Sequence, residues 1–185
     1  MEIAGDQTDT NTPVEPWEDA PLDELIDHIL VTFHQPLRQD LPRLEAMARE
    51  VVDLHRETEP VMLPAVLSTL LGLKAELEDH MAKEEQILFP MIKQGQGWMA
   101  DGPISVMRHE HDSATAALAE LRRLTADYGL PAEACATWKA LWRGLTALEE
   151  ALHRHIRLEN DILFPRALDS LSAKALPSAS SQNGV

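Results

Sequence analysis

Apolar residues recur at about the α-helical period through most of the chain, in stretches long enough for extended helices. In the first stretch they occupy positions 22, 25, 26, 29, 30 and 33. Prolines and glycines separate the stretches, as expected of residues that interrupt or end helices. The pattern predicts four helices, over residues 21 to about 57, 64–92, 103–128 and 131–168. Pro36 and Pro42 lie inside the first helix, where we expect a kink or a local break.

The connections near residues 59–64 and near Gly129 are short, which places consecutive helices side by side and antiparallel. Alternation at the strand period is scarce. We therefore predict an all-α fold, an antiparallel up-down four-helix bundle over residues 20–169. Residues 1–19, rich in Asp, Glu, Thr and Pro, are expected to be a disordered lead, and residues 170–185 a flexible tail.

One motif occurs twice, at an offset of 75 residues. Residues 80–90 read HMAKEEQILFP and residues 155–165 read HIRLENDILFP. Each copy places a His and a Glu four positions apart, on one face of a helix, where both side chains can reach a metal ion. A single pair of this kind is usually a solvated surface pair. Packing explains why Ile-Leu-Phe-Pro repeats, but it does not explain why His and Glu repeat with it.

His34 and His111 occupy the matching place on the other two helices. They lie 77 residues apart, and each precedes its own copy of the motif by a similar length. The chain therefore reads as two helical hairpins, each with a His, a loop and then His-x-x-x-Glu. His55 lies 21 residues after His34, roughly 31 Å along a straight helix. Both histidines bind one site only if that helix breaks and folds back.

The predicted set is four imidazoles and two carboxylates: His34, His80, Glu84, His111, His155 and Glu159. The set is too large for one tetrahedral zinc ion and too rich in nitrogen for calcium or magnesium. It fits two ions, each with two His, bridged by both Glu and by an oxide or hydroxide. Iron is the metal we expect, with manganese second. The histidines and glutamates could instead be structural residues of a bundle that binds no metal. Burying them without partners would cost several kcal/mol, so this alternative ranks last.

The net charge of the chain restricts the classes of partner that it can bind. A formal net charge of -15 argues against nucleic acid and against an anionic membrane surface, and it favours cations. No apolar run approaches a membrane span, and no signal peptide is apparent. The single cysteine, Cys135, excludes an internal disulfide and suits a reducing cytoplasm; we expect it to be a small packing residue.

These residues together resemble the hemerythrin-like (HHE cation-binding) family. The likeness is closest to its branch of iron–sulfur cluster repair di-iron proteins, also called repair-of-iron-centres proteins. The segments that carry the resemblance are Ile26–Ile29, Phe33–His34, His80–Ile92, Gly102–Met107, Glu110–Asp112, Ala134–Lys139 and His155–Asn160.

The resemblance implies a non-haem di-iron centre and a role in repairing damaged iron–sulfur clusters under nitrosative or oxidative stress, by iron donation or by binding nitric oxide. Its motif positions coincide with the six residues above, and it adds His55 as a candidate ligand or neighbour of the site. It also implies a polar path for iron at Glu76 and Glu110. Many family members begin with a small domain bearing a Cys-Cys pair, and we expect this chain to be a short form without it.

Two functions from different classes therefore stand beside each other. One is a stress protein that donates iron to client iron–sulfur proteins or handles nitric oxide. The other is a carrier or sensor of O2 or nitric oxide that performs no net chemistry. Labile iron favours the first, and tightly held iron with reversible gas binding favours the second.

Overall fold

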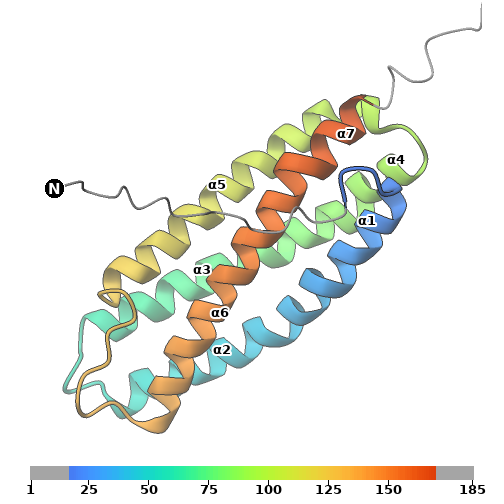
Figure 1. The fold of residues 1–185 in the computed structure, drawn as a ribbon. Helices are drawn as coiled ribbons and strands as arrows, with labels where there is room; N and C mark the ends of the chain where they lie inside the picture. Colours follow the sequence, from blue (N-terminus) through green and yellow to red (C-terminus); the bar gives the residue numbers. More distant parts are fainter. Residues whose placement is uncertain (1–16, 170–185) are drawn as a thin grey trace, which may run out of the picture.

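A computed structural model describes residues 17–169, and within this range every regular element is a helix. The helical elements join end to end into four long rods, which lie side by side in Figure 1. Three are interrupted by a π-helical turn. The first rod consists of α1 (Leu22–Ile29), the π turn η1 (Leu30–His34) and α2 (Gln35–Leu54). The second consists of α3 (Met62–Lys83), the π turn η2 (Glu84–Leu88) and α4 (Phe89–Lys93). The third is α5 (Asp101–Leu124), preceded by the 3-10 turn η3 (Gly97–Met99), and the fourth consists of α6 (Ala136–Leu158), the π turn η4 (Glu159–Leu163) and α7 (Phe164–Asp169).

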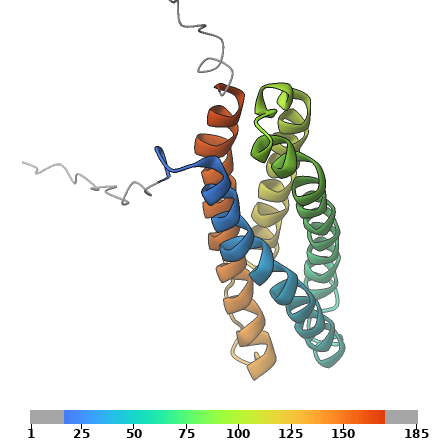
Figure 2. The same ribbon diagram turned by 90° about the vertical axis from the view of Figure 1, so that its right-hand side faces the viewer.

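The rods form an elongated antiparallel bundle. α2 packs against α3 and α6, and α3 packs against α5. The turned view shows the first rod inclined to the others, so that it runs from beside the fourth rod at one end toward the second rod at the other (Figure 2). The turns after α2 and α5 meet at one end, while α1, α4 and α7 gather at the other (Figure 1). The predicted all-α four-helix bundle is confirmed.

Several predicted boundaries were wrong. The fourth rod begins at Ala136 rather than at residue 131, because Cys135 caps it: its Sγ accepts a hydrogen bond from the backbone N–H of Trp138, at 3.4 Å from the nitrogen. The third rod ends at Leu124, before three residues with left-handed φ angles, Ala126–Tyr128. Cys135 packs against the core, as expected, but it also has this capping role.

Residues 17–20, which precede α1, are in contact with the rest of the bundle. Trp17 packs on the apolar cluster at its end of the bundle, and Arg166 of α7 donates hydrogen bonds to the carbonyl oxygens of Trp17 and Ala20, at 2.7 and 2.6 Å. Residues 17–19 therefore belong with the domain. Residues 1–16 of the predicted lead and the predicted tail, 170–185, lie outside the described residues.

Each π turn precedes a proline by two residues. The prolines are Pro36, Pro90 and Pro165, and the carbonyl four residues before each belongs to the third residue of the turn. A proline has no N–H and its ring clashes with that carbonyl, and a π turn relieves the clash by lengthening the hydrogen-bonded loop. The expected break near Pro36 thus takes the form of a π turn just before it, whereas α2 continues through Pro42.

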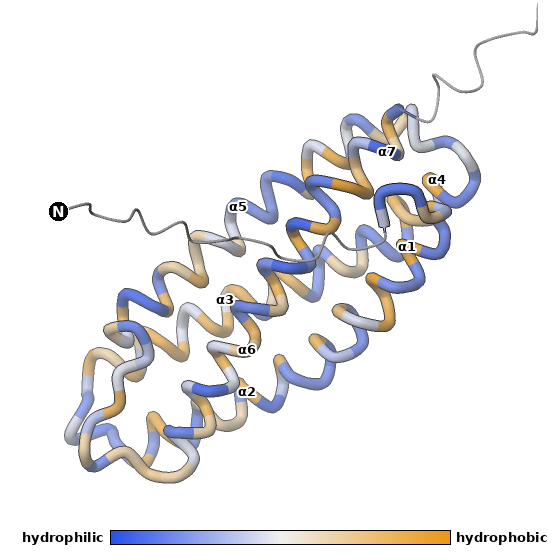
Figure 3. Tube along the Cα trace, viewed as in Figure 1, coloured by the Kyte–Doolittle hydropathy of each residue, from blue (hydrophilic) through white to orange (hydrophobic). Residues whose placement is uncertain are grey.

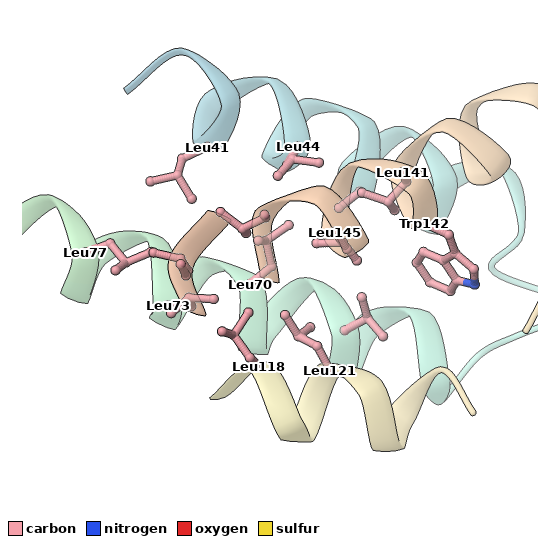
Figure 4. Packing of buried hydrophobic residues seen from close by; sticks show 14 of the residues in the cluster. Leu41, Leu44, Leu70, Leu73, Leu77, Leu118, Leu121, Leu141, Trp142 and Leu145 are labelled. Atoms are coloured by element: carbon pink, nitrogen blue, oxygen red, sulfur yellow. The ribbon is translucent and has the colours of Figure 1, made fainter. Parts of the chain in front are cut away.

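The core consists of two apolar clusters, one toward each end. The larger one is rich in leucine and contains Trp142 (Figure 4), together with Trp138. The smaller one contains Phe33, Phe89 and Phe164. Hydrophobic positions recur along every rod between hydrophilic ones (Figure 3), as expected of amphipathic helices. None of the helices in residues 17–169 combines the length and the apolar character needed to cross a bilayer.

Candidate metal centre

The six candidate ligands form a polar layer between the two apolar clusters. On the second rod, for example, Met81 belongs to one cluster and Leu88 to the other, and Glu84 lies between them. All six side chains are buried, with at most 3% of any residue exposed: His34, His80, Glu84, His111, His155 and Glu159. The structure therefore brings together every residue of the predicted set, one or two from each rod.

The layer divides into two groups that share both carboxylates. One group is His34 and His155 with Glu84 and Glu159, and the other is His80 and His111 with the same two Glu. The donor atoms of each group lie within 4.8 Å of one another. The histidines of a group thus come from different halves of the sequence repeat. This is a detail that the repeat alone did not predict.

The imidazoles turn the same nitrogen toward the centre. Nε2 of His34 and Nε2 of His80 each lie 3.3 Å from Oε2 of Glu84. Nε2 of His111 lies 3.1 Å from Oε2 of Glu159, and Nε2 of His155 lies 3.0 Å from Oε1 of Glu159. Each carboxylate therefore stands between two imidazoles, which is the arrangement of a bridging ligand.

These inward atoms lack hydrogen-bond partners. The four Nε2 atoms and both oxygens of Glu84 and Glu159 are buried without one. A buried polar atom without a partner is costly, and native structures contain few of them. Eight of them facing one space is the pattern expected where cations complete the bonding, so the donor set fits two metal ions.

Burial and neighbouring charges shift the acidities within the layer in opposite directions. Burial and the charge of Glu159 raise the pKa of Glu84. Burial acts to raise the pKa of Glu159 as well, but His155 and His111 outweigh it and hold that pKa well below its usual range. Burial lowers the pKa of His34, yet Glu84 and Glu85 more than compensate, and the net shift is upward. The layer thus favours positive charge, as a site for cations requires.

Three of the four histidines are held from outside through their other nitrogen. Nδ1 of His34 lies 2.8 Å from Oε1 of Glu85, and Nδ1 of His80 lies 3.0 Å from Oε2 of Glu110. Nδ1 of His111 lies 3.1 Å from Oδ1 of Asn160. Such contacts fix the ring, make the Nδ1–H tautomer the favoured one and raise the basicity of Nε2.

Glu85 and Asn160 were missed from the sequence, although each follows a bridging Glu directly. The π turn brings this next residue round to face a neighbouring rod. The signal was present in the motif itself, which has Glu-Glu in one copy and Glu-Asn in the other. Glu110 was singled out only through the family resemblance, and its contact with His80 gives it a second role.

Phenylalanine rings cover three of the histidines. Phe89 stacks on His34 and Phe164 on His111, each at 5.8 Å between ring centroids. Phe33 stacks on His155 at 5.1 Å. Phe89 and Phe164 come from the repeated Ile-Leu-Phe-Pro segments, so these segments both shape the π turns and cover the imidazoles.

His55 is not brought to the centre. It lies at the end of α2, with its ring against Trp138 at 4.8 Å in the apolar half of the bundle, and it belongs to neither donor group. The first rod continues past His34 through the π turn instead of folding back, so His55 stays at the far end of α2, away from both donor groups.

Glu76 and Glu110 lie on one crevice that leads to the layer. It is lined by residues of α3, α5 and α6, among them His80, His111 and His155. Glu76 is exposed at the surface, while Glu110 is closer to the histidines and also pairs with Lys83. The two carboxylates therefore line the approach to three of the candidate ligands.

Comparisons with known proteins agree with this geometry. Residues 25–167 match the hemerythrin HHE cation binding domain. The chain belongs to this family. Relatives named iron-sulfur cluster repair protein YtfE are 49% identical in Escherichia coli O81 and 48% identical in Escherichia fergusonii; each alignment covers 157 residues, 84% of this chain and 71% of the relative.

Hemerythrin domains bind a pair of iron ions, and the donor set described above suits that cofactor. Mixed imidazole and carboxylate ligands are typical of non-haem iron. The four histidines and two glutamates would hold two irons, and binding to them would account for all eight inward atoms that lack hydrogen bonds.

Proposed function

We propose that this protein uses two iron ions, held by His34, His80, Glu84, His111, His155 and Glu159, to help repair damaged iron–sulfur clusters. In this proposal it gives up iron to client iron–sulfur proteins or binds nitric oxide at the same centre. The observation that carries it is the buried layer of orphaned donor atoms, in a chain about half identical to proteins named for iron–sulfur cluster repair. The single free cysteine leads us to place this work in a reducing cytoplasm.

The residues of the chain have separate tasks in this proposal. Glu84 and Glu159, which belong to both donor groups, would hold the iron pair together with the four imidazoles. Glu85, Glu110 and Asn160 hold the Nδ1 protons of three histidines and keep their Nε2 atoms turned inward. When bound, the iron pair supplies redox chemistry and positions for a small ligand such as nitric oxide or O2. The phenylalanines that stack on the imidazoles keep bulk water from the layer.

We propose the crevice with Glu76 and Glu110 as the route by which iron leaves. Carboxylates attract and transiently bind cations on their way out, and their successive placement from surface to His80 provides such steps. Burial acts to raise the pKa of Glu110, but Lys83 and His80 lower it overall, so this carboxylate stays charged at neutral pH. The donor group of His80 and His111 contributes both of its histidines to the lining of this route, whereas the other group contributes only His155.

An iron-transfer assay tests the proposal. The ferrous-loaded chain is mixed without oxygen with a metal-free iron–sulfur protein, a sulfide source and a thiol, and cluster absorbance is followed. We expect the chain to supply iron, with Glu76→Gln slowing the transfer and Glu120→Gln, an acid on α5 paired with Arg123, leaving it unchanged. Iron that stays bound while nitric oxide or O2 binds reversibly would overturn donation in favour of the carrier or sensor.

A further inference from the structure

A chain of aromatic rings connects the surface to one candidate iron ligand. The ring of Trp17 packs against that of His28, with 4.4 Å between the centroids and a tilt of 32° between the planes. His28 meets the edge of Phe33 at 6.1 Å, and Phe33 lies parallel to His155 at 5.1 Å. Trp17 and His28 are half-buried and Phe33 is buried, so the rings lead inward step by step. The last ring is that of an imidazole whose Nε2 faces the centre.

Separate contacts fix the outer rings in place. Arg166 on α7 binds the carbonyl oxygens of Trp17 and Ala20 and so holds the segment that carries the indole. Thr32 lies within hydrogen-bond distance of Nδ1 of His28, at 3.2 Å, which fixes the second ring. Phe33 belongs to the π turn η1, beside His34. The arrangement therefore relies on two rods and on the segment before α1.

Phe33 also differs from its counterpart in the repeat. It precedes His34 as Glu110 precedes His111, so the same position supplies an acid in one half and a ring in the other. The acid holds His80 and lines the crevice, whereas the ring covers His155 and continues outward to His28. The surroundings of the two histidines thus differ. His80 is approached by carboxylates, which suit cations, and His155 by aromatic rings.

We propose that the rings of Trp17, His28, Phe33 and His155 form the route by which an external one-electron reductant, such as a reduced flavin, reduces ferric iron in this protein. Electron tunnelling weakens steeply with distance and with gaps, and rings in contact offer short steps. Trp17 is the outermost of the four rings, which makes it the end at which the electron would enter. Each electron oxidises the donor by one unit and converts one ferric ion to ferrous, while the rings only mediate.

This route deepens the proposed function and rests on it, since it requires the chain to hold iron. Ferrous ions exchange their ligands faster than ferric ions, so reduction at the ringed end would prepare iron for release through the acidic crevice. It does not require that iron–sulfur repair be the outcome.

The test compares how fast the oxidised, iron-loaded chain is reduced. Photoreduced flavin is mixed with it in the absence of oxygen, and the loss of the ferric absorbance is followed in a stopped-flow instrument. Trp17→Leu removes the outer ring but keeps an apolar cover, and Phe33→Leu removes the ring next to His155. Trp98→Leu is the control, because Trp98 is another solvent-accessible tryptophan, 47% exposed, but lies in η3. Iron content and midpoint potential are measured for each variant.

The route predicts that Trp17→Leu and Phe33→Leu slow reduction several-fold at unchanged midpoint potential and iron content, while Trp98→Leu behaves as the wild type. The proposed route is overturned if the Trp17→Leu variant is reduced as fast as the wild type. It is also overturned if the slower reduction of a variant is explained by a shift in the midpoint potential of its iron. If Phe33→Leu loses iron, the comparison of Trp17→Leu with the wild type decides the test, because Trp17 is half-buried and packs against His28, which is not a candidate ligand. Failure of the wild-type chain to bind iron would instead refute the proposed function, so the two failures are distinguishable.

Discussion

Replacing Glu110 by Gln removes a negative charge from the outer side of one candidate ligand while keeping the size of the side chain. Oε2 of Glu110 lies 3.0 Å from Nδ1 of His80, and no such contact joins it to His34 or His155 in the described structure. Lys83 and His80 lower the pKa of Glu110 against the effect of burial, so the charge is present at neutral pH. The substitution should therefore weaken the metal position at His80 and His111 selectively.

The size of the effect follows from the partial exposure of this carboxylate. Losing an outer partner of a ligating histidine typically costs 10- to 100-fold in metal affinity. The Glu110 side chain is 24% exposed and also pairs with the exposed Lys83, so solvent screens part of its charge. We expect the lower end, about tenfold or 1.4 kcal/mol, at one of the two positions.

The assay is an anaerobic titration of the metal-free chain with ferrous iron, or with cobalt as a coloured probe, resolving two binding steps. Glu110→Gln should weaken one step, and Glu85→Gln, which faces His34, should weaken the other. Glu120→Gln, on the same helix as Glu110 but paired with Arg123, should change neither. Equal weakening of both steps by Glu110→Gln, or no weakening, would refute the reasoning that each outer acid supports one position.

Three further predictions concern the rest of the bundle. Burial and the hydrogen bond that its hydroxyl donates to Glu149 raise the pKa of Tyr128, the single tyrosine, above its ordinary value of 10.0. The neutral phenol therefore stabilises the folded state fully below pH 10, and this contribution is lost as the pH rises through the folded-state pKa. An absorbance titration should show tyrosinate at higher pH in the folded chain than in urea, and coincident titrations would contradict this. Gly97→Ala places a Cβ 2.5 Å from the carbonyl oxygen of Ala167 and should lower the free energy of unfolding by about 1–3 kcal/mol in denaturant melts. Gly72→Ala, in open space within α3, should raise it by up to about 1 kcal/mol. Equal stability of the two variants would be inconsistent with this packing. His55→Ala should retain both metal ions by elemental analysis, and loss of either would mean that the site has been placed wrongly.

The ligand set was readable from the sequence because it repeats. His80 with Glu84 and His155 with Glu159 recur in one frame, and His34 and His111 hold equivalent places before them. Helical periodicity and the spacing of the loops were enough to predict that the four rods bring these residues to one level. The structure places all six in one buried layer.

The details that escaped depend on local departures from the regular helix. Periodicity cannot reveal a π turn, so the inward turn of Glu85 and Asn160 toward neighbouring histidines was not foreseen. The prolines two residues after each turn were the available signal, and α5, which has no proline near His111, is uninterrupted. Likewise, Pro131 suggested a helix start, but the cap at Cys135 sets it later.

Metal analysis of the chain purified without oxygen, combined with an optical spectrum after exposure to air, tests the central claim most directly. Two iron ions per chain, with absorption bands of an oxygen-bridged ferric pair, are the predicted result. Their loss in a Glu84→Ala Glu159→Ala variant that remains helical by circular dichroism would assign the bridging role to these two carboxylates. One zinc ion per chain, or a folded wild-type chain that takes up no iron, would contradict the account.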